Sequence, residues 1–471
     1  MLAYWSAPAC GLAVLTYLRL GRISWTAGLG LALLVLPFSA WPALGCAIAS
    51  LAAWRCGTWP RARAGTIVIG ADKSRRAVAI PLGGASGSHT MIVGATGSGK
   101  TVTETLIVSR AIELGLGAVI VDPKGDPLLR EHARAAAERA GRAFLEWTPS
   151  GPSTYNPYGH GSAGEIADKA LAGERYTEPH YLRQAQRYLA HAVRALDAVG
   201  ESATPARLVE LMDPRRLELL ARSVPDEVHA RVLFAYLDTL DARQRSGLNG
   251  TRDRLAILAE SEIGRWLAPA AGAPALDLLD AVRARAVSYF RLESDRLPLL
   301  SAMLAAAIVG DLLTVAASCQ AAPVATLVAI DEFSAIAPDG VARLFGRARA
   351  AGFSLLLATQ ELADLRSAAP ALLEQVLGNV ETVVAHRQSV PDSAELVARI
   401  AGTRPAWSST EQLEHAVPTG RGSRSRSREF AIHPDVIRTL ARGCAAVSVA
   451  SEGRCAVARI THPADPKEMK R

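Results

Sequence analysis

The residues most able to do chemistry lie in one glycine-rich segment, residues 94–101 (Gly-Ala-Thr-Gly-Ser-Gly-Lys-Thr). The segment matches the GxxxxGK[ST] phosphate-binding loop, and it stands between a short apolar run at 89–94 and a helix-like stretch that reaches Leu114. In this setting the glycines let backbone N–H groups converge on phosphate oxygens at a helix N-terminus. We therefore predict an ATP site in which Lys100 contacts the β- and γ-phosphates, Thr101 is a ligand of Mg²⁺, and the loop consists of Gly94, Ala95, Thr96, Gly97, Ser98, Gly99, Lys100 and Thr101.

Two adjacent carboxylates, Asp331 and Glu332, follow a second apolar run at residues 327–330. A phosphate-binding loop needs an acidic strand end nearby to hold its metal ion, and we expect Asp331 to hold Mg²⁺ through water. Glu332 would then polarise the attacking water, because a second carboxylate is typical of P-loop enzymes that hydrolyse ATP for work. The alternative is an acidic turn after a buried strand.

The pattern of apolar runs predicts an α/β fold with a mostly parallel sheet. Further strand-like runs lie at 117–122, 353–360 and 381–387, and helical patterns separate them. The run at 353–360 ends in Gln360, which we expect to sense the γ-phosphate. A helix and a strand within 276–292 are expected to rejoin the sheet.

The chain between Asp122 and residue 327 is about 200 residues long, far more than a crossover helix needs. Residues 163–270 are rich in Ala, Leu, Arg and Glu, with apolar residues spaced by three and four, which predicts an all-α insertion. The expected domains are a membrane anchor at 1–60, a first part of the nucleotide-binding domain at 61–199, the insertion at 200–270 and a second part at 271–471.

The N-terminal end has the composition of a membrane anchor. No charged side chain occurs in residues 1–18 or 23–54, which predicts two transmembrane helices, near 2–20 and 30–53. More basic residues follow the second span than lie between the spans, so the N-terminus and the ATPase domain are expected to face the cytoplasm. The expected location is the cytoplasmic (inner) membrane, as a multi-pass protein. The alternative is a cleaved signal peptide or a lipoprotein signal at Cys46, which would separate the nucleotide site from cytosolic ATP.

Composition narrows the class of protein and leaves the partner open. With 49% hydrophobic and 21% charged residues, the chain is neither disordered nor fibrous. Its six scattered cysteines contain no CxxC pair, which excludes a disulfide scaffold and a zinc module. A net charge of +7 over 471 residues permits a polyanionic partner without requiring one.

Two basic segments are candidates for contacts with nucleic acid. Residues 420–428 interleave serines with Arg421, Arg424, Arg426 and Arg428, but the segment contains no aromatic side chain on which bases could stack. The alternative is that these residues form a solvated loop between strands and do not contact nucleic acid. The second candidate is a basic face of the insertion formed by Arg243, Arg245, Arg252 and Arg254, for which a solvated helix face is the alternative.

Taken in order, these motifs resemble the type IV secretion coupling proteins of conjugative DNA transfer, in the FtsK/HerA branch of RecA-like motor ATPases. The resemblance rests on the two N-terminal spans, the P-loop, Asp122-Pro-Lys-Gly-Asp126, Tyr155-Asn-Pro157, the Asp331–Glu332 pair and the Ala-Thr-Gln element that ends at Gln360. It extends from about residue 66 to 460. It implies a RecA-like P-loop NTPase fold and a membrane-anchored homo-hexamer that couples a relaxase-bound single DNA strand, or protein substrates, to an inner-membrane secretion channel.

The resemblance also implies a role for Arg349, eleven residues before Gln360. This position matches that of an arginine finger that reaches the ATP of the neighbouring subunit, although Arg347 is close enough to be the finger instead. Two other functions stay open. One is an FtsK-like double-stranded DNA translocase, which would usually carry more spans and a winged-helix domain. The other is a membrane ATPase or scaffold that energises protein secretion without nucleic acid.

Overall fold

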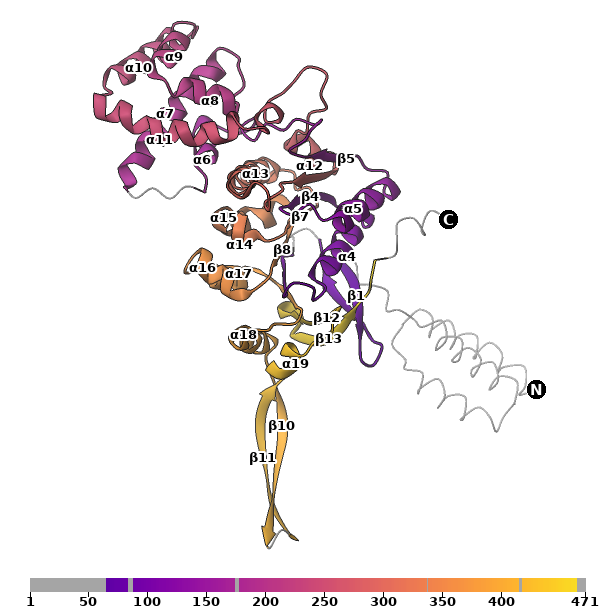
Figure 1. Cartoon of the computed structure of the whole chain (residues 1–471). Helices are drawn as coiled ribbons and strands as arrows, with labels where there is room; N and C mark the ends of the chain where they lie inside the picture. The colour runs from indigo at the N-terminus through magenta and orange to yellow at the C-terminus, as the bar shows by residue number, and fades with distance from the viewer. Residues whose placement is uncertain (1–64, 84–87, 174–177, 337, 415–416, 464–471) are drawn as a thin grey trace, which may run out of the picture. The chain divides into compact units, whose positions relative to one another are not determined.

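The structure, a computed structural model, describes residues 65–83, 88–173, 178–336, 338–414 and 417–463 (Figure 1). These residues belong to one compact unit, Gly65–Arg471. The two predicted membrane helices lie outside the described residues, and so does the predicted anchor at 1–60.

An 11-stranded sheet forms the centre of the described part of the chain, in the order β2-β1-β13-β12-β9-β3-β8-β7-β4-β6-β5. The strands from β9 to β5 all pair in parallel. They are β9 (Thr382–Ala385), β3 (Thr90–Val93), β8 (Phe353–Thr359), β7 (Thr326–Ile330), β4 (Gly117–Asp122), β6 (Val287–Arg291) and β5 (Phe144–Trp147). The predicted α/β fold with a mostly parallel sheet is therefore confirmed, and every apolar run that the prediction used is a strand.

Helices cover both faces of the parallel strands, which is why those strands are continuous apolar runs. Every residue of β4, β7 and β8 is buried. One face packs against α4 (Lys100–Glu113) and α5 (Pro127–Arg139). The other face packs against α13 (Pro298–Cys319), α14 (Phe333–Ile336) and α15 (Pro338–Ala351).

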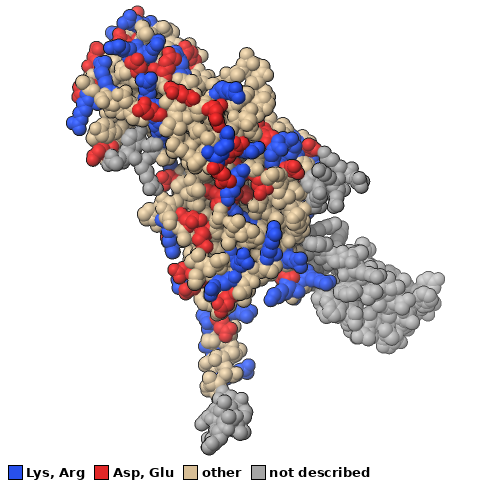
Figure 2. Space-filling model, viewed as in Figure 1, with Lys and Arg blue, Asp and Glu red and all other residues tan. Residues whose placement is uncertain are grey.

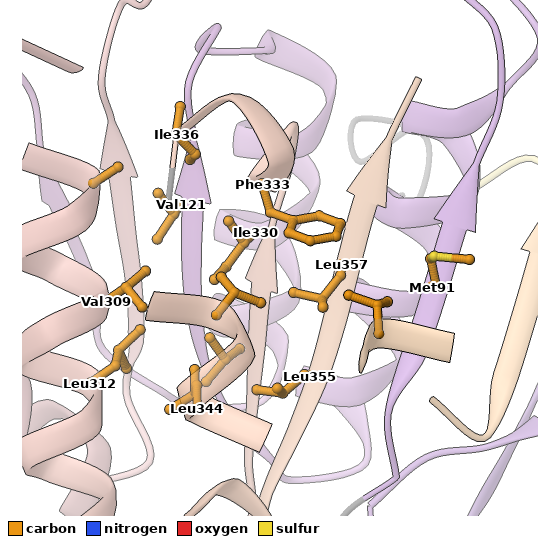
Figure 3. Close-up of a cluster of buried hydrophobic side chains, with 14 of the residues drawn as sticks. Met91, Val121, Val309, Leu312, Ile330, Phe333, Ile336, Leu344, Leu355 and Leu357 are labelled. Carbon is orange, nitrogen blue, oxygen red and sulfur yellow. The ribbon is translucent and has the colours of Figure 1, made fainter. Parts of the chain in front are cut away.

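Figure 3 shows the second of these contacts in detail. Val309 and Leu312 of α13 and Leu344 of α15 lie against the strand residues Ile330 and Leu355. Because successive strand residues point to opposite faces, the alternate residues of the same strands enter the core on the α4 side. The strands are thereby fixed from both faces, and the residues at their ends have fixed positions.

Four strands that the sequence analysis missed extend the sheet beyond β9 with antiparallel pairing. They are β12 (Cys444–Val449), β13 (Arg454–Ile460), β1 (Thr66–Asp72) and β2 (Ala77–Pro81). Buried and partly exposed residues alternate in β2 and in the first half of β1, so neither segment is a continuous apolar run. β12 matters for the candidate site, because its first residue contacts the end of β9 (see below).

The chain between β5 and β6 folds into helices, as the sequence predicts for an all-α insertion. The buried side chains of this helical unit form a core of their own, which extends from Tyr158 to Leu255 and includes Ala307 of α13. The helices are α6 (Ala163–Ala170), α7 (Pro179–Ala198), α8 (Pro205–Leu211), α9 (Pro214–Ala221), α10 (Glu227–Asp238) and α11 (Ala242–Ala259). The 3₁₀ turn η2 (Gly264–Trp266) and α12 (Leu278–Arg283) then lead into β6.

The C-terminal third contains short helices and one long hairpin. Helices α16 (Leu362–Ala368), α17 (Leu372–Asn379), α18 (Pro391–Ala401) and α19 (Pro434–Arg438) and the turn η3 (Ala450–Glu452) connect the last strands of the sheet. Between α18 and α19 the strands β10 (Thr403–Glu414) and β11 (Val417–Phe430) pair only with each other. This hairpin projects away from the sheet (Figure 1).

One described helix, α13, is long and apolar enough to cross a membrane. Most of its apolar stretch is buried inside the protein, between the sheet and the helical unit. Such burial is typical of the core helix of a globular domain, so we assign α13 to the core.

A buried ion pair joins the helical unit to α13. The ammonium of Lys169 on α6 lies 2.8 Å from a carboxylate oxygen of Asp311 on α13, and both residues are almost completely buried. The hydroxyl of Tyr155 donates to the other oxygen of Asp311 at 3.0 Å. Within the Tyr155-Asn-Pro157 motif, Tyr155 therefore has a structural role in docking the insertion.

We predict that Lys169→Met lowers the free energy of unfolding by about 3–5 kcal/mol, because it leaves the buried carboxylate of Asp311 without its cation. Urea unfolding followed by circular dichroism measures the loss. The double variant Lys169→Met/Asp311→Leu removes both charges and should recover most of the stability. A single variant within about 0.5 kcal/mol of the wild type, the range of ordinary surface substitutions, would contradict this role of the pair.

Candidate nucleotide site

The carboxyl ends of four neighbouring strands bring the predicted site residues together. β3 leads into the P-loop, β8 into Gln360 and β7 into Asp331 and Glu332, while β4 ends at Asp122. These strands are adjacent and parallel in the order β3-β8-β7-β4. The carboxyl edge of an open parallel sheet is where α/β proteins bind ligands.

The glycines of the P-loop are required by its backbone and by its neighbours. Gly97 and Gly99 have positive φ values of 75° and 114°, which other residues rarely adopt. A side chain at Gly94 would place a Cβ atom 2.7 Å from Ser98 Oγ and 2.7 Å from His386 Cβ. The loop is therefore closely packed against the end of β9.

The first turn of α4 is suited to bind an anion. The helix starts at Lys100, and its N-cap residue is Gly99, which has no side chain to accept from the free N–H groups of that turn. Exposed N–H groups and the positive end of the helix dipole favour a phosphate at this place. Thr101 is the second residue of the same turn and is partly exposed.

Lys100 lies between the two predicted carboxylates. Its Nζ is 2.7 Å from Asp331 Oδ1 and 2.7 Å from Glu332 Oε1. Burial alone would lower the pKa of Lys100, but the charges and hydrogen bonds of the two carboxylates outweigh burial and raise its pKa. The structure thus brings together the three residues that the sequence assigned to phosphate, metal and water.

The two carboxylates have different environments. Burial raises the pKa of Asp331, and Lys100 only partly offsets this effect. Burial also raises the pKa of Glu332. The charges and hydrogen bonds of Lys100, Gln360 and Lys124 outweigh burial, so the pKa of Glu332 is lowered. The surroundings of Glu332 therefore favour its ionised form more than those of Asp331 do.

Glu332 is held by three donors and a rare backbone conformation. Its Oε1 accepts from Lys100, from Gln360 Nε2 at 2.8 Å and from Lys124 Nζ at 3.3 Å. Its φ of 47° is uncommon for a residue other than glycine, and such strain persists where the surrounding structure enforces it. Gln360 also connects this group to the P-loop, since its Oε1 accepts from the hydroxyl of Thr96 at 3.2 Å.

Three functional candidates lie here that sequence reasoning had given no role. The first is Lys124. Asp122 accepts from the backbone N–H groups of Lys124, Gly125 and Asp126, and the resulting tight loop places Lys124 near Glu332. The signal in the sequence was that Lys124 is one of only six lysines and stands inside a motif already noted.

The second is His386, which follows β9. Its Nδ1 donates to the carbonyl of Cys444 on β12, so its Nε2 accepts from the hydroxyl of Thr103 on α4, at 2.8 Å. Burial lowers the pKa of His386 to about 4, which keeps the ring neutral in this arrangement. His386 thereby connects the P-loop helix to the antiparallel part of the sheet. The signal in the sequence was that His386 is a polar residue at the end of the apolar run 381–387.

The third is Glu104, one turn after Lys100 on α4. It is 1% exposed, and within the described part of the chain neither of its carboxyl oxygens has a hydrogen-bond partner. Burial, together with the nearby charge of Asp331, raises the pKa of Glu104 well above its usual range. The surroundings therefore favour a neutral carboxylic acid beside the candidate metal site.

The predicted arginine fingers lie away from this cluster. Arg349 is in the last turn of α15 and donates to the carbonyl of Asn379, whereas Arg347 donates to the carbonyl of Leu313. Arg349 precedes β8, so it lies at the amino end of the strand whose carboxyl end carries Gln360. Because β8 has seven residues, the two edges are about 20 Å apart.

The two basic segments considered as nucleic-acid contacts have structures that differ from the predicted ones. Residues 420–428 belong to strand β11, not to a loop between strands. In the insertion, Arg254 is 8% exposed and donates to the carbonyls of Leu171 and Ala172, so it does not contribute to a basic surface there. Arg245 also donates to a backbone carbonyl, that of Leu240.

The arrangement fits ATP and Mg²⁺. The P-loop has the glycines and the uncapped helix start that phosphate needs, and Lys100 supplies a cation. Asp331 and Thr101 provide oxygen ligands of the kind that Mg²⁺ prefers.

Two family models match the sequence in the regions that form this site. The model described as "Helicase HerA, central domain" matches residues 65–131, which include the P-loop. The model described as "TraM recognition site of TraD and TraG" matches residues 325–442, which include Asp331, Glu332 and Gln360. A comparison with curated protein sequences gives no match.

The fold is similar to the solved structures of a bacterial conjugative coupling protein and of VirB4. An unbound form of the bacterial conjugative coupling protein TrwB is 16% identical, with 80% of this chain and 86% of that chain covered and a TM-score of 0.61. TrwB in complex with ADP and Mg²⁺ is 16% identical, with 81% and 88% covered and a TM-score of 0.59. VirB4 of Thermoanaerobacter pseudethanolicus is 14% identical, with 86% and 97% covered and a TM-score of 0.56.

These likenesses show the fold, which is that of a RecA-like P-loop NTPase. Together with the two family models, they confirm the predicted resemblance to the type IV secretion coupling proteins.

We predict a pH dependence of stability that comes from His386. Free histidine has a pKa of 6.5, and the value of about 4 in the folded protein means that the unfolded chain binds the proton more tightly. The free energy of unfolding should therefore fall as the pH decreases from 6.5 to 4, by up to about 1.4 kcal/mol per pH unit from this residue.

The measurement is urea unfolding of the wild type, His386→Gln and the control His180→Gln across that pH range. His180 is exposed in the helical unit, so its variant should keep the wild-type slope, whereas His386→Gln should have a shallower one. Equal slopes for all three proteins would contradict the assignment of a buried, neutral His386.

Proposed function

We propose that this chain is a coupling protein: a membrane-anchored motor that hydrolyses ATP and passes DNA, as a relaxase-bound single strand, or protein substrates to a type IV secretion channel. The observation that carries the proposal is the cluster of Lys100, Asp331, Glu332 and Gln360 at the carboxyl edge of β3, β8 and β7. The two family models support the choice of this class among P-loop ATPases.

Each residue of the cluster has a role that follows from its contacts. Mg·ATP supplies the γ-phosphoryl group that is transferred to water. With Mg·ATP bound, Lys100 would exchange its two carboxylate partners for phosphate oxygens, and Thr101 and Asp331 would hold the metal ion, which would neutralise charge on the phosphates. Glu332, to which Gln360 and Lys124 also donate, accepts the proton of the attacking water. Gln360 contacts both Glu332 and Thr96, so it can report a change in the P-loop to the catalytic carboxylate.

An arginine supplied by a neighbouring subunit completes the proposed site. Arg349 lies about one strand length from the P-loop of its own chain, so it can act on ATP only in trans. Such a trans-acting arginine is the reason to propose a homo-hexameric ring, in which the Arg349 of one subunit reaches the nucleotide of the next. Arg347 remains the alternative finger.

We propose the domain organisation of a membrane-anchored motor. Residues 1–60 anchor the chain as two transmembrane helices, 61–199 and 271–471 contain the motor domain, and 200–270 is the separable part of the helical insertion, whose first helices, α6 and α7, precede residue 199. The motor domain faces the cytoplasm, where ATP is available, and inner-membrane channel components are its partners in the membrane.

Two other functions are consistent with an ATP site of this kind. One is FtsK-like translocation of double-stranded DNA. The other is an ATPase or scaffold that energises protein secretion without nucleic acid. The match at residues 325–442 favours the coupling protein over both, because that family model is named for a recognition site of TraD and TraG.

We predict that Lys100→Ala abolishes ATP hydrolysis and that Glu332→Gln binds Mg·ATP without hydrolysing it. Lys100 contacts phosphate, whereas the Glu332 substitution removes one charge and leaves Asp331 to hold Mg²⁺. Phosphate release and binding of a fluorescent ATP analogue measure the two properties on the full chain. Turnover of Lys100→Ala within a few-fold of the wild type would refute the site, and absence of nucleotide binding by Glu332→Gln would refute the division of roles.

We predict that Arg349→Ala binds ATP but hydrolyses it about 10³- to 10⁵-fold more slowly, the effect of removing an arginine finger. Lys100→Ala subunits still carry Arg349, and Arg349→Ala subunits still carry an intact P-loop. A mixture of the two should therefore show activity that neither variant has alone, because one complete site forms wherever they meet in the correct order. Wild-type turnover by both Arg349→Ala and Arg347→Ala would contradict a trans-acting finger.

A further inference from the structure

The β10–β11 hairpin has two chemically different faces. Strand residues alternate between faces, and the register pairs Trp407 with Arg426, Ser409 with Arg424 and Pro405 with Arg428. The three arginines, at alternate positions of β11, therefore share one face with Trp407. We call this the Trp–Arg face; it consists of Trp407, Arg424, Arg426 and Arg428.

Contacts of the side chains agree with this assignment. The guanidinium of Arg424 lies over the ring of Trp407, 5.3 Å from the ring centroid. Arg428 donates to the hydroxyl of Thr403, which is on the same face. Residues 420–428 contain no aromatic side chain, but Trp407 supplies one from the opposite strand.

The other face of the hairpin is nearly neutral. Thr410 and Ser423 form a directly opposed pair on it, with hydroxyl oxygens 2.7 Å apart. Its other described residues are mainly serines, apart from the opposed pair of Arg404 and Glu429 at the base of the hairpin. Positive charge is therefore concentrated on the Trp–Arg face.

The Trp–Arg face is open to solvent. Trp407 is 60% exposed, which is unusual for a tryptophan, and Arg424, Arg426 and Arg428 are exposed as well. Figure 2 shows basic side chains on the hairpin below the body of the sheet domain. An exposed aromatic ring among arginines is a site that the fold itself does not use.

We propose that the Trp–Arg face binds single-stranded DNA, with one base stacked on Trp407 and the backbone phosphates paired with the three arginines. This inference rests on the proposed function, since it names the surface that contacts the transported strand. Arginines two residues apart on one strand repeat every ~6.7 Å, a spacing of the same order as that between successive phosphates of an extended strand. Stacking on an aromatic ring and pairing of phosphates with cations are the two means by which proteins bind single strands without sequence preference.

The chemistry of the face favours a single strand over its competitors. In a duplex the bases are already stacked on each other, so a duplex would gain nothing from the exposed ring of Trp407. A protein partner would be expected to bury an apolar core, but the described residues that surround Trp407 on this face are arginines, Pro405 and Ser409. Trp407 is thus an isolated ring among cations.

The test is fluorescence anisotropy of the nucleotide-free full chain with a labelled 30-nucleotide oligo(dT) and with a labelled 30-base-pair duplex, over a series of salt concentrations. The variants are Trp407→Ala, Trp407→Phe and the triple variant Arg424→Gln/Arg426→Gln/Arg428→Gln. The matched control is Arg404→Gln, which removes an exposed arginine from the opposite face of the same hairpin. Thermal unfolding of each variant shows whether it is folded.

We expect Trp407→Ala to weaken binding of oligo(dT) roughly 5- to 150-fold, while Trp407→Phe retains most of the affinity. The triple variant should reduce the slope of log K against log salt by about 2, because three phosphate contacts are lost. Arg404→Gln should bind like the wild type. Binding of the duplex should be insensitive to Trp407→Ala.

Three results would overturn the inference: unchanged oligo(dT) binding by Trp407→Ala, equal losses for the duplex and the single strand, or a loss with Arg404→Gln as large as that with a single substitution on the Trp–Arg face. Because these measurements are made without nucleotide, they are independent of ATP hydrolysis. Failure of the proposed motor function would instead appear as absence of turnover in the wild type, whatever the hairpin binds.

Discussion

The buried ammonium of Lys100 is the interaction on which the rest of the structure depends. A charge in this position must be paired, and the carboxylates of Asp331 and Glu332 pair with it at 2.7 Å each. The pairing joins the loop after β3 to the end of β7, two strands that are separated in the sheet by β8. Gln360, at the end of β8, completes the connection through Glu332 and Thr96. Three strand ends are thereby held in the geometry that a nucleotide would require.

The same pairing suits a site that exchanges one anion for another. A phosphate group offers Lys100 the negative charge that the carboxylates now supply, so nucleotide binding can free Asp331 for the metal ion and Glu332 for water. After such an exchange Gln360 and Lys124 still donate to Glu332. His386 and the glycines of the P-loop limit how far the loop can move, since they pack it against β9 and β12.

Sequence reasoning predicted the parallel part of the sheet because strands buried on both faces are continuous apolar runs, as in 117–122 and 353–360. It failed for β1, β2 and the polar hairpin, where alternation or polarity obscures the pattern, and for β12 and β13. The P-loop and Asp331 could be predicted because their chemistry requires local spacing. No role could be assigned to His386, Glu104 and Lys124 from the sequence, since their roles come from contacts between segments far apart in the chain, such as that between Thr103 and His386. Trp407 was missed for the same reason: only the register of β10 with β11 places it among the arginines.

The central claim is that this site hydrolyses ATP in a motor that acts on DNA. The most direct test is steady-state ATP turnover by the wild-type chain, without DNA, with single-stranded DNA and with duplex DNA, over a range of protein concentrations. The account predicts turnover per subunit that rises with protein concentration, as ring assembly requires, and rises further with single-stranded DNA. Turnover that is absent, or that is independent of both protein concentration and DNA, would contradict it.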